Sequence, residues 1–464
     1  MPRFPAVLLA GAALAGCTVG PDYKRPSVPS GVGWTEPGTP GAVDLAWWDR
    51  FGDAQLSALV ARAIGNSPDL AEAEARLAEA RANRRAVAGT RLPSVTANGS
   101  ATENVLSRNG QLPIGEIPGF QREFRLFDGG FDASWEIDLW GRHVRQGEAA
   151  AAREEAALFA RRDVMLSLIA EVARNYLDLR TAQANAATAR ATADADADLA
   201  RLTRLRFGAG EASRLDAETA EGAARASAAA VPDAEANATA AAYRIATLVG
   251  STPEEVGATL RMPAPLPISP DEILVGVRSD LLERRPDVRQ AERELAAATA
   301  DIGVATADLF PRFSLLGGIG QQARNPGDLF SADSMRLQVG PSVSWPIFSG
   351  GTIRAQIRAA DARGQGAAAR YEKAVLGALS DSETAINRFL NARIGAQEAA
   401  AALVRERSAF ALSEQRVASG EDDRLALARA RKSLLVAERR SSDAAAGKAQ
   451  AAVALFKALG GGWS

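Results

Sequence analysis

The chain has 464 residues, of which 47% are hydrophobic and 24% charged, and its 54 Lys+Arg nearly balance its 56 Asp+Glu. This balance argues against a nucleic-acid binder, which would carry a basic excess. One Cys and one His exclude an intrachain disulfide and a thiolate zinc cluster, and they leave little for histidine chemistry. Only 6% of the residues are aromatic. We therefore expect long helices packed by small side chains, no cofactor and no enzymatic activity.

The first residues have the pattern of a secretory signal. Arg3 precedes a short apolar stretch that is too short to span a membrane as a helix. The stretch ends in Leu14-Ala15-Gly16-Cys17, a sequence typical of a bacterial lipobox. We expect residues 1–16 to be a signal peptide and Cys17 to carry a covalent lipid. The alternative is an ordinary signal peptide followed by a chance Cys. Thr18, rather than Asp, at the next position favours sorting to the outer membrane.

The remaining chain contains two related segments. Pro93 recurs as Pro311, at an offset of 218 residues, and Trp135 recurs as Trp345, at an offset of 210. We therefore expect two copies of one unit of about 200 residues. The first copy covers 68–250 and the second 286–464. A linker, 251–285, joins them, and its prolines up to Pro270 discourage helix.

Each copy begins with a helix and then changes to period two, which predicts strands at about 94–106, 123–138, 312–321 and 336–346. Strands of roughly ten residues that alternate apolar and polar side chains are typical of a membrane β-barrel. A half-buried soluble sheet would show the same alternation, and the lipobox favours the membrane. Four strands cannot close a barrel, so several chains must contribute. Two copies would give eight strands and three would give twelve, and both remain possible from this count.

A very long helix follows each pair of strands, at 142–207 and at 352–417. About 65 residues at 1.5 Å per residue extend roughly 100 Å, which suits a structure that crosses the periplasm. Each helix ends at a glycine turn, and helices return over 211–249 and 421–459. We expect Pro232 to break the first of these into two pieces.

Several motifs together resemble the TolC-like outer-membrane factor family, in the lipoprotein branch that serves tripartite efflux pumps. They are Cys17-Thr18-Val19-Gly20-Pro21-Asp22-Tyr23, Trp47-Trp48, Trp135-Glu136-Ile137-Asp138-Leu139-Trp140-Gly141-Arg142, and Leu281-Leu282-Glu283-Arg284-Arg285-Pro286-Asp287-Val288. The resemblance implies a mainly α fold with a membrane β-barrel. It also implies a homotrimer with a twelve-stranded barrel, a long α-helical periplasmic tunnel, and a small equatorial domain that begins within 17–67.

The resemblance also implies where the tunnel would close and meet its partner. It places Gly210 and Gly420 in the periplasmic turns that contact an adaptor protein, with Arg214 and Arg424 as candidates for ion pairs there.

Acidic residues near these turns are candidates for the gate. Asp216 matches an acidic position of the family, whereas Ala426 and Arg429 stand where the second copy often has acids. Asp422 and Asp423 could supply the missing negative charge, or they could simply be the acids that favour a helix start.

The function implied is an outer-membrane channel that passively conducts substrates from an inner-membrane transporter of the resistance-nodulation-division (RND) type and a periplasmic adaptor to the outside. Its partners would be two further copies of the chain, the adaptor (membrane fusion) protein, the transporter and outer-membrane lipid of a Gram-negative bacterium, with no nucleic acid. Two alternatives are the duct of a type I protein secretion system and a non-conducting envelope lipoprotein.

Overall fold

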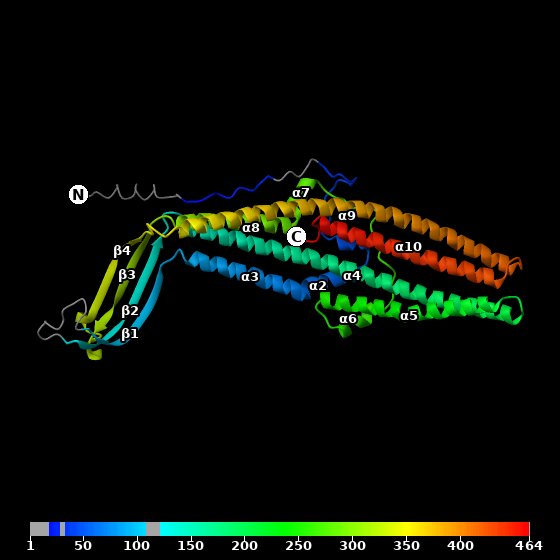
Figure 1. Cartoon of the computed structure of the whole chain (residues 1–464), viewed down its shortest axis with the longest axis horizontal. Helices are drawn as coiled ribbons and strands as arrows, with labels where there is room; N and C mark the ends of the chain where they lie inside the picture. The colour runs from blue at the N-terminus through cyan, green and yellow to red at the C-terminus, as the bar shows by residue number, and fades with distance from the viewer. Residues whose placement is uncertain (1–17, 28–32, 108–120, 464) are drawn as a thin grey trace. The chain divides into compact units, whose positions relative to one another are not determined.

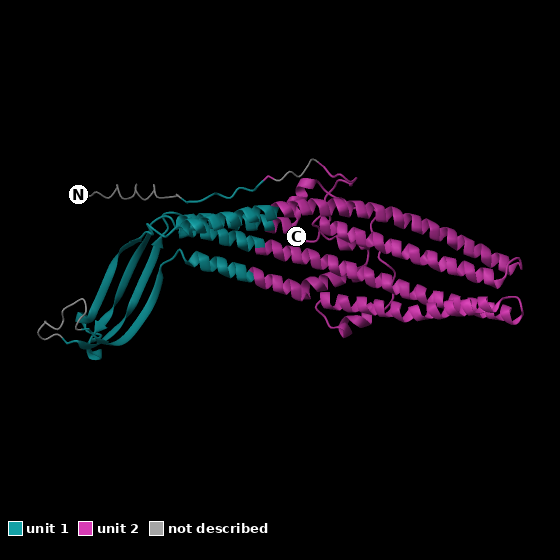
Figure 2. Ribbon diagram, in the orientation of Figure 1, with its two compact units in different colours: residues 1–26, 78–156, 291–371 teal, residues 27–77, 157–290, 372–464 magenta. Residues whose placement is uncertain are grey.

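The computed structural model describes residues 18–27, 33–107 and 121–463, which form mainly helices and one small sheet. The chain divides into two compact units (Figure 2). Unit 1 takes its described residues from 1–26, 78–156 and 291–371, and unit 2 takes its own from 27–77, 157–290 and 372–464. The expected signal peptide, 1–16, and Cys17 lie outside the described residues.

The sheet belongs to unit 1, is antiparallel, and has the strand order β1-β2-β3-β4 (Figure 1). The strands are β1 (Ser94–Val105), β2 (Glu123–Ile137), β3 (Arg312–Ala323) and β4 (Met335–Ser344). In every pair of strands an odd-numbered residue lies opposite an odd-numbered residue. One face of the sheet therefore collects the apolar residues of the alternating pattern. Many of these side chains are exposed in the single chain, among them Val95, Phe131, Leu315, Leu337, Val339 and Val343.

The segment that follows Cys17 is held against helices of unit 1. These helices are the start of α4 (Arg142–Gly208), which follows β2, and α8 (Pro286–Ala307), which precedes β3. The Arg145 guanidinium donates to the Asp22 carboxylate at 2.6 Å, and the Tyr23 hydroxyl donates to Glu292. Burial, with this hydrogen bond, raises the pKa of Tyr23.

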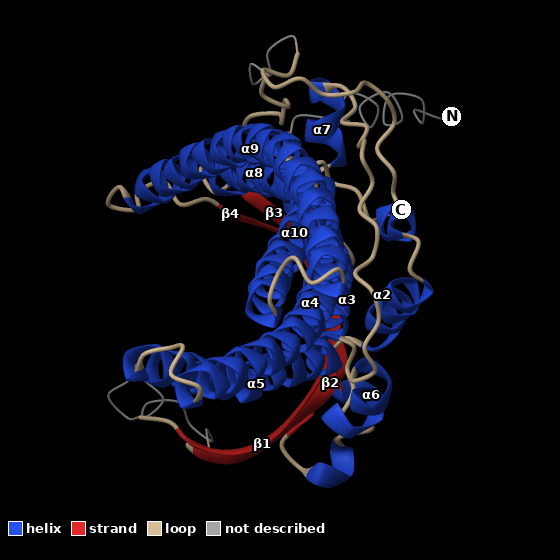
Figure 3. Ribbon diagram, turned by 90° about the vertical axis from the view of Figure 1, so that its right-hand side faces the viewer, coloured by secondary structure: helices blue, strands red, loops and turns tan. Residues whose placement is uncertain are grey.

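Unit 2 consists of antiparallel helices. The α4 helix and α5 (Arg214–Leu248) form one hairpin, and α9 (Thr352–Ala418) and α10 (Arg424–Ala458) form the other (Figure 1). Three short helices lie along one side of these long helices (Figure 3): α2 (Ala54–Asn66), α6 (Pro253–Leu260) and α7 (Arg278–Arg284). The described chain also contains α3 (Pro68–Gly89) and 3₁₀ turns at Trp47–Phe51, Pro326–Asp328 and Ala332–Ser334.

The core of unit 2 is centred on Trp47, whose side chain is completely buried. Its ring stacks on that of Phe456 in α10, with 5.2 Å between centroids and 9° between planes. Its indole N–H donates to the Gly461 carbonyl at 3.2 Å. These contacts connect the 3₁₀ turn near the start of the unit to the last residues of the chain.

Two expectations about proline are wrong. Pro232 does not break the returning helix, because α5 runs without interruption from Arg214 to Leu248 with Pro232 inside it. The φ angle of proline suits a helix, and its missing N–H removes a single backbone bond, which the rest of a 35-residue helix tolerates. The linker 251–285 is also not free of helix, since it contains α6 and α7. Pro253 stands at the start of α6, where proline is favoured.

Within the described residues, no helix has a stretch both long and apolar enough to cross a membrane.

Candidate functional site: the ends of the two helical hairpins

The turns at the ends of the two hairpins have the same backbone structure. Gly210 and Gly420 adopt positive φ angles of 77° and 78°, which side chains other than glycine rarely tolerate. In each turn the residue after the glycine donates its N–H to the carbonyl of an arginine five positions earlier. Glu211 donates to Arg206 and Glu421 to Arg416, both at 2.8 Å. No other atom lies within 4 Å of a Cβ built on either glycine. The backbone conformation, and not space, therefore selects glycine here.

Each of the three candidate gate acids has a local partner. Asp216 forms a capping box with Ser213 at the start of α5, and these hydrogen bonds from Ser213 lower the pKa of the Asp216 carboxyl. Asp423 caps α10 by accepting from the Ala426 N–H at 2.7 Å. Asp422 pairs with Arg416 at 2.6 Å, and this contact raises the pKa of the arginine. Removing all three acids would therefore also weaken two helix starts.

The two candidate arginines differ in their contacts. Arg214 approaches Glu218 on its own helix at 3.6 Å, and both side chains are well exposed. Arg424 makes no ion pair with the part of the chain that the structure describes. Exposed pairs of this kind contribute little stability, so both arginines remain available to a partner.

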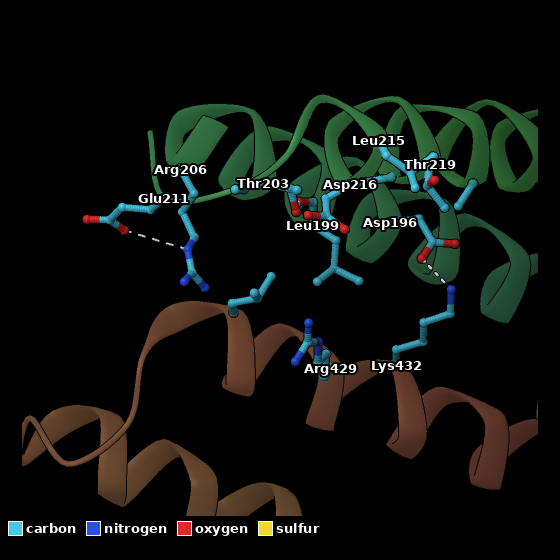
Figure 4. A pocket seen from close by; sticks show the side chains of 14 residues that line it. Asp196, Leu199, Thr203, Arg206, Glu211, Leu215, Asp216, Thr219, Arg429 and Lys432 are labelled. Atoms are coloured by element: carbon cyan, nitrogen blue, oxygen red, sulfur yellow. Dashed lines mark hydrogen bonds and ion pairs between the residues drawn. The ribbon is translucent and has the colours of Figure 1, made fainter. Parts of the chain in front are cut away.

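A cavity of about 550 Å³ lies between the two hairpins near these turns (Figure 4). One wall comes from α4 and α5, and Arg429 and Lys432 of α10 face it from the other hairpin. Its lining combines charged and apolar residues: Asp196, Leu199, Thr203, Arg206, Glu211, Ala212, Leu215, Asp216, Thr219, Ala220, Ala223, Leu425, Arg429 and Lys432.

Two ion pairs cross between the hairpins beside this cavity. Lys432 Nζ lies 2.7 Å from Asp196 Oδ1, and the Asp196 side chain is only 4% exposed. Asp196 also accepts from the Ser227 hydroxyl of α5. Nearer the turns, Arg206 Nη1 lies 3.4 Å from Asp423 Oδ2. We call these two pairs the hairpin links.

No sequence pattern indicates the hairpin links. Asp196 and Lys432 are separated by 236 residues, and each stands on a long helix with many similar charged positions. The charge of Asp423 makes it a candidate gate acid, but no sequence pattern indicates Arg206 as its partner. Only the packing of α10 on α4 brings these charges together.

A second charged cluster surrounds Asp163 on α4. Arg285 binds Asp287 at 2.6 Å and Asp381 at 3.4 Å, and it donates to the Ala458 carbonyl at 3.3 Å. The motif Arg284-Arg285-Pro286-Asp287 thus connects the start of α8 to the end of α10 through Arg285. Burial raises the pKa of the nearby Asp163 carboxyl, and the charge of Asp287 adds to the increase.

We expect Asp163→Asn to stabilise the protein at neutral pH. A raised pKa in the folded state means that folding disfavours the charged form, so the wild type loses stability as the pH rises above about 4, the ordinary aspartate value. The melting temperatures of Asp163→Asn and of the wild type should therefore converge in acid and separate toward pH 7. Asp271→Asn is the control, because Lys448 lowers the pKa of Asp271 and the substitution should destabilise at neutral pH. If Asp163→Asn melted at a lower temperature than the wild type at pH 7, the raised pKa of Asp163 would be contradicted.

Two long helical hairpins and a four-stranded antiparallel sheet in one chain define the fold of a TolC-like outer-membrane channel subunit. The solved outer-membrane channel OprN has a TM-score of 0.85 at 36% identity, over 96% of this chain and 100% of that chain. A model of the family described as outer membrane efflux protein matches residues 59–251 and 277–461. The chain therefore belongs to the outer membrane efflux protein family, which confirms the resemblance seen in its motifs.

Two relatives with similar sequences also support membership in this family. The pyoverdine export outer membrane protein OpmQ of Pseudomonas aeruginosa is 31% identical over 99% of this chain and 96% of its own length. Nodulation protein T of Rhizobium leguminosarum bv. trifolii is 30% identical over 80% of this chain and 79% of its own length. The chain is accordingly an outer-membrane channel component of an efflux pump in a Gram-negative bacterium, and it is not an enzyme.

Proposed function

We propose that three copies of the chain form a passive efflux duct, in which each copy contributes four strands to a twelve-stranded barrel and two hairpins to a periplasmic tunnel. In this proposal the two copies of the repeat, 68–250 and 286–464, supply equivalent parts. The equatorial domain begins within 17–67, and the linker 251–285 joins the two copies. The duct works with a periplasmic adaptor and an inner-membrane transporter of the RND type, which supplies the energy.

The observation that carries the proposal is the sheet of unit 1. Its outer strands β1 and β4 each have one edge without a partner among the described residues, and its apolar face includes exposed Phe131, Leu315 and Val343. In lipid, an open edge would leave backbone groups unsatisfied at a cost of several kcal/mol each. Pairing β4 of one copy with β1 of another removes the edges and places the apolar face in lipid.

The polar face of the same sheet suits the inside of a water-filled barrel. Arg336 of β4 reaches across β3 to Asp128 of β2 at 2.8 Å, and Gln322 donates to the same carboxylate. Asn98 of β1 donates to the Asp132 carboxylate of β2 at 2.7 Å. Charged groups such as these are tolerated on the lumen side, where water and partners satisfy them.

The lengths of the helices support a tunnel that crosses the periplasm. Helices α4 and α9 each have 67 residues. At 1.5 Å per residue a helix of this length extends about 100 Å.

We propose that the turns at Gly210 and Gly420 are the adaptor contact and the tunnel entrance, with Arg214 and Arg424 exposed to the partner. The acids Asp216, Asp422 and Asp423 give this end negative charge. The hairpin links hold the two hairpins of one chain together in the closed state, so adaptor binding opens the entrance by breaking them.

We also propose that Cys17 carries a lipid that anchors the chain in the outer membrane. Val19, two residues later, donates its N–H to the Trp140 carbonyl at 3.1 Å. A Cβ on Gly141, which has φ of 73°, would lie within 3 Å of Thr18. These contacts hold the residue after Cys17 at the junction of β2 and α4, where the strands leave the membrane in this proposal.

The proposal predicts that a strain lacking the gene accumulates more of a fluorescent pump substrate than its parent, and that this chain restores the parental level. A protonophore should abolish the difference, because the energy comes from the transporter. An empty vector is the control. A type I secretion duct would instead change the export of a protein and leave dye accumulation unaltered, and a non-conducting lipoprotein would change neither.

A further inference from the structure

The two strand hairpins of the chain are related by the same pair of offsets that relates their sequences. Pro93 precedes β1 and Pro311 precedes β3, at an offset of 218. Trp135 in β2 and Trp345 after β4 are offset by 210. If the two strand hairpins share one register, a pair of residues in β1 and β2 predicts a pair in β3 and β4. The β3 residue is found by adding 218 to the β1 residue, and the β4 residue by adding 210 to the β2 residue.

The observed registers obey this rule. In the first strand hairpin, formed by β1 and β2, Ser94 lies opposite Ser134. In the second, formed by β3 and β4, Arg312 lies opposite Ser344. Arg312 follows Ser94 by 218 residues, and Ser344 follows Ser134 by 210. The two hairpins therefore have the same register, not merely the same topology.

Hydrogen bonds at the ends of the strands obey the same rule. The Trp135 indole donates to the Arg91 carbonyl at 2.9 Å, and the Trp345 indole donates to the Leu309 carbonyl at 3.0 Å. Leu309 follows Arg91 by 218 residues. The correspondence thus extends from the strands into the helix ends that precede them.

Among the described residues, the backbone ladder that joins the two strand hairpins is the one between β2 and β3. In it Ala133 lies opposite Gly317, and Trp135 lies opposite Leu315. If neighbouring copies meet as the two hairpins of one chain meet, β4 must take the place of β2, and β1 of the next copy must take the place of β3. Moving Ala133 forward by 210 gives Val343, and moving Gly317 back by 218 gives Gly99.

We propose that β4 of one chain pairs antiparallel with β1 of a second copy in the register that places Val343 opposite Gly99. Leu337 then lies opposite Val105, and Trp345 opposite Ala97. The inference rests on the proposed homotrimer and names the surface and the register by which its copies join.

The faces of the strands agree with this register. It joins odd-numbered to odd-numbered residues, as the three ladders within the chain do. The exposed apolar side chains of Val343, Val339 and Leu337 therefore continue the apolar face of the sheet onto Val105 and Val95 of the next copy. A slip by one residue would turn that whole face toward the polar side. A slip by two residues would keep the face, and only a measurement of distance distinguishes it.

The ladder between β2 and β3 provides a pair of known distance with which disulfide formation between copies can be compared. A Cβ built on Gly317 lies 3.9 Å from the Cβ of Ala133, which is within the range that a disulfide bridges. Gly99 has space for a side chain, since the nearest atom to its Cβ position is the Asp128 carbonyl oxygen at 4.0 Å. The pair Ala133→Cys with Gly317→Cys therefore reports the contact within a chain, and Gly99→Cys with Val343→Cys reports the proposed contact between chains.

The test is oxidation of outer membranes that contain these variants, followed by non-reducing electrophoresis. We expect Gly99→Cys/Val343→Cys to give covalent dimers and trimers, and Ala133→Cys/Gly317→Cys to give an internally bridged monomer. The unsubstituted chain, whose single Cys is Cys17, controls for disulfides through that residue. Ala97→Cys/Val343→Cys is the control for a slip of two residues, which separates the positions by about 7 Å along the strand.

The results separate this inference from the proposed function. Stronger linkage in Ala97→Cys/Val343→Cys than in Gly99→Cys/Val343→Cys would overturn the register. So would a trimeric, efflux-competent protein in which the internal pair oxidises and the Gly99/Val343 pair does not. A protein that stays monomeric in the outer membrane and restores no efflux would overturn the homotrimer itself, and the register with it.

Discussion

Single channels of the Asp196→Asn/Asp423→Asn double variant should be open about five to thirty times more often than those of the unsubstituted chain. The two substitutions remove the charges of both hairpin links, from Lys432 to Asp196 and from Arg206 to Asp423. Asparagine still accepts a hydrogen bond from Ser227 and still caps α10 well. If the two links together favour the closed entrance by about 1–2 kcal/mol, their loss changes the open fraction by that factor. The measurement is conductance in planar bilayers.

A matched control removes the same number of charges without touching the links. Glu218→Gln/Glu221→Gln neutralises two acids whose ion-pair partners lie on their own hairpin and belong to neither link: Arg214, Arg204 and Arg225. This control should leave the open fraction close to that of the unsubstituted chain. Equal increases in both double variants would show that general negative charge at the entrance, and not the links, keeps it closed.

Trp47→Ala should destabilise the protein by about 3–5 kcal/mol, the usual cost of deleting a large buried aromatic side chain. The substitution removes the stacking on Phe456 and the hydrogen bond to Gly461, and it leaves a cavity in the core of unit 2. Trp48→Ala is the matched control, since Trp48 is only half-buried and contacts Trp47 edge-on. Thermal unfolding in detergent, followed by helical circular dichroism, should show a much larger decrease for Trp47→Ala. Similar decreases for the two variants would contradict the assigned core.

Much of the fold could be predicted because its elements are long and strongly periodic. The change from helical spacing to strict alternation marks β1 to β4, and the observed ends differ from the expected ones by only a few residues. The glycine turns were also recognisable, because a positive φ at Gly210 and Gly420 has few alternatives to glycine. Local chemistry determines these features.

Features that depend on tertiary packing could not be predicted in this way. Pro232 stays inside α5, because one missing backbone bond is outweighed by the rest of a long helix. The hairpin links could not be predicted either, since nothing near Asp196 in the sequence indicates Lys432 as its partner. The capping roles of Asp216 and Asp423 were accessible from local sequence, and Ser213 three residues before Asp216 was the signal.

The most direct test of the account is the single-channel conductance of the purified, unsubstituted chain in a planar bilayer without adaptor, transporter or nucleotide. A passive duct that closes at its hairpin ends should show discrete but infrequent openings, and the same preparation of Asp196→Asn/Asp423→Asn should open far more often. Inserted, folded protein that conducts nothing in either form would contradict the conclusion that this chain is itself the channel.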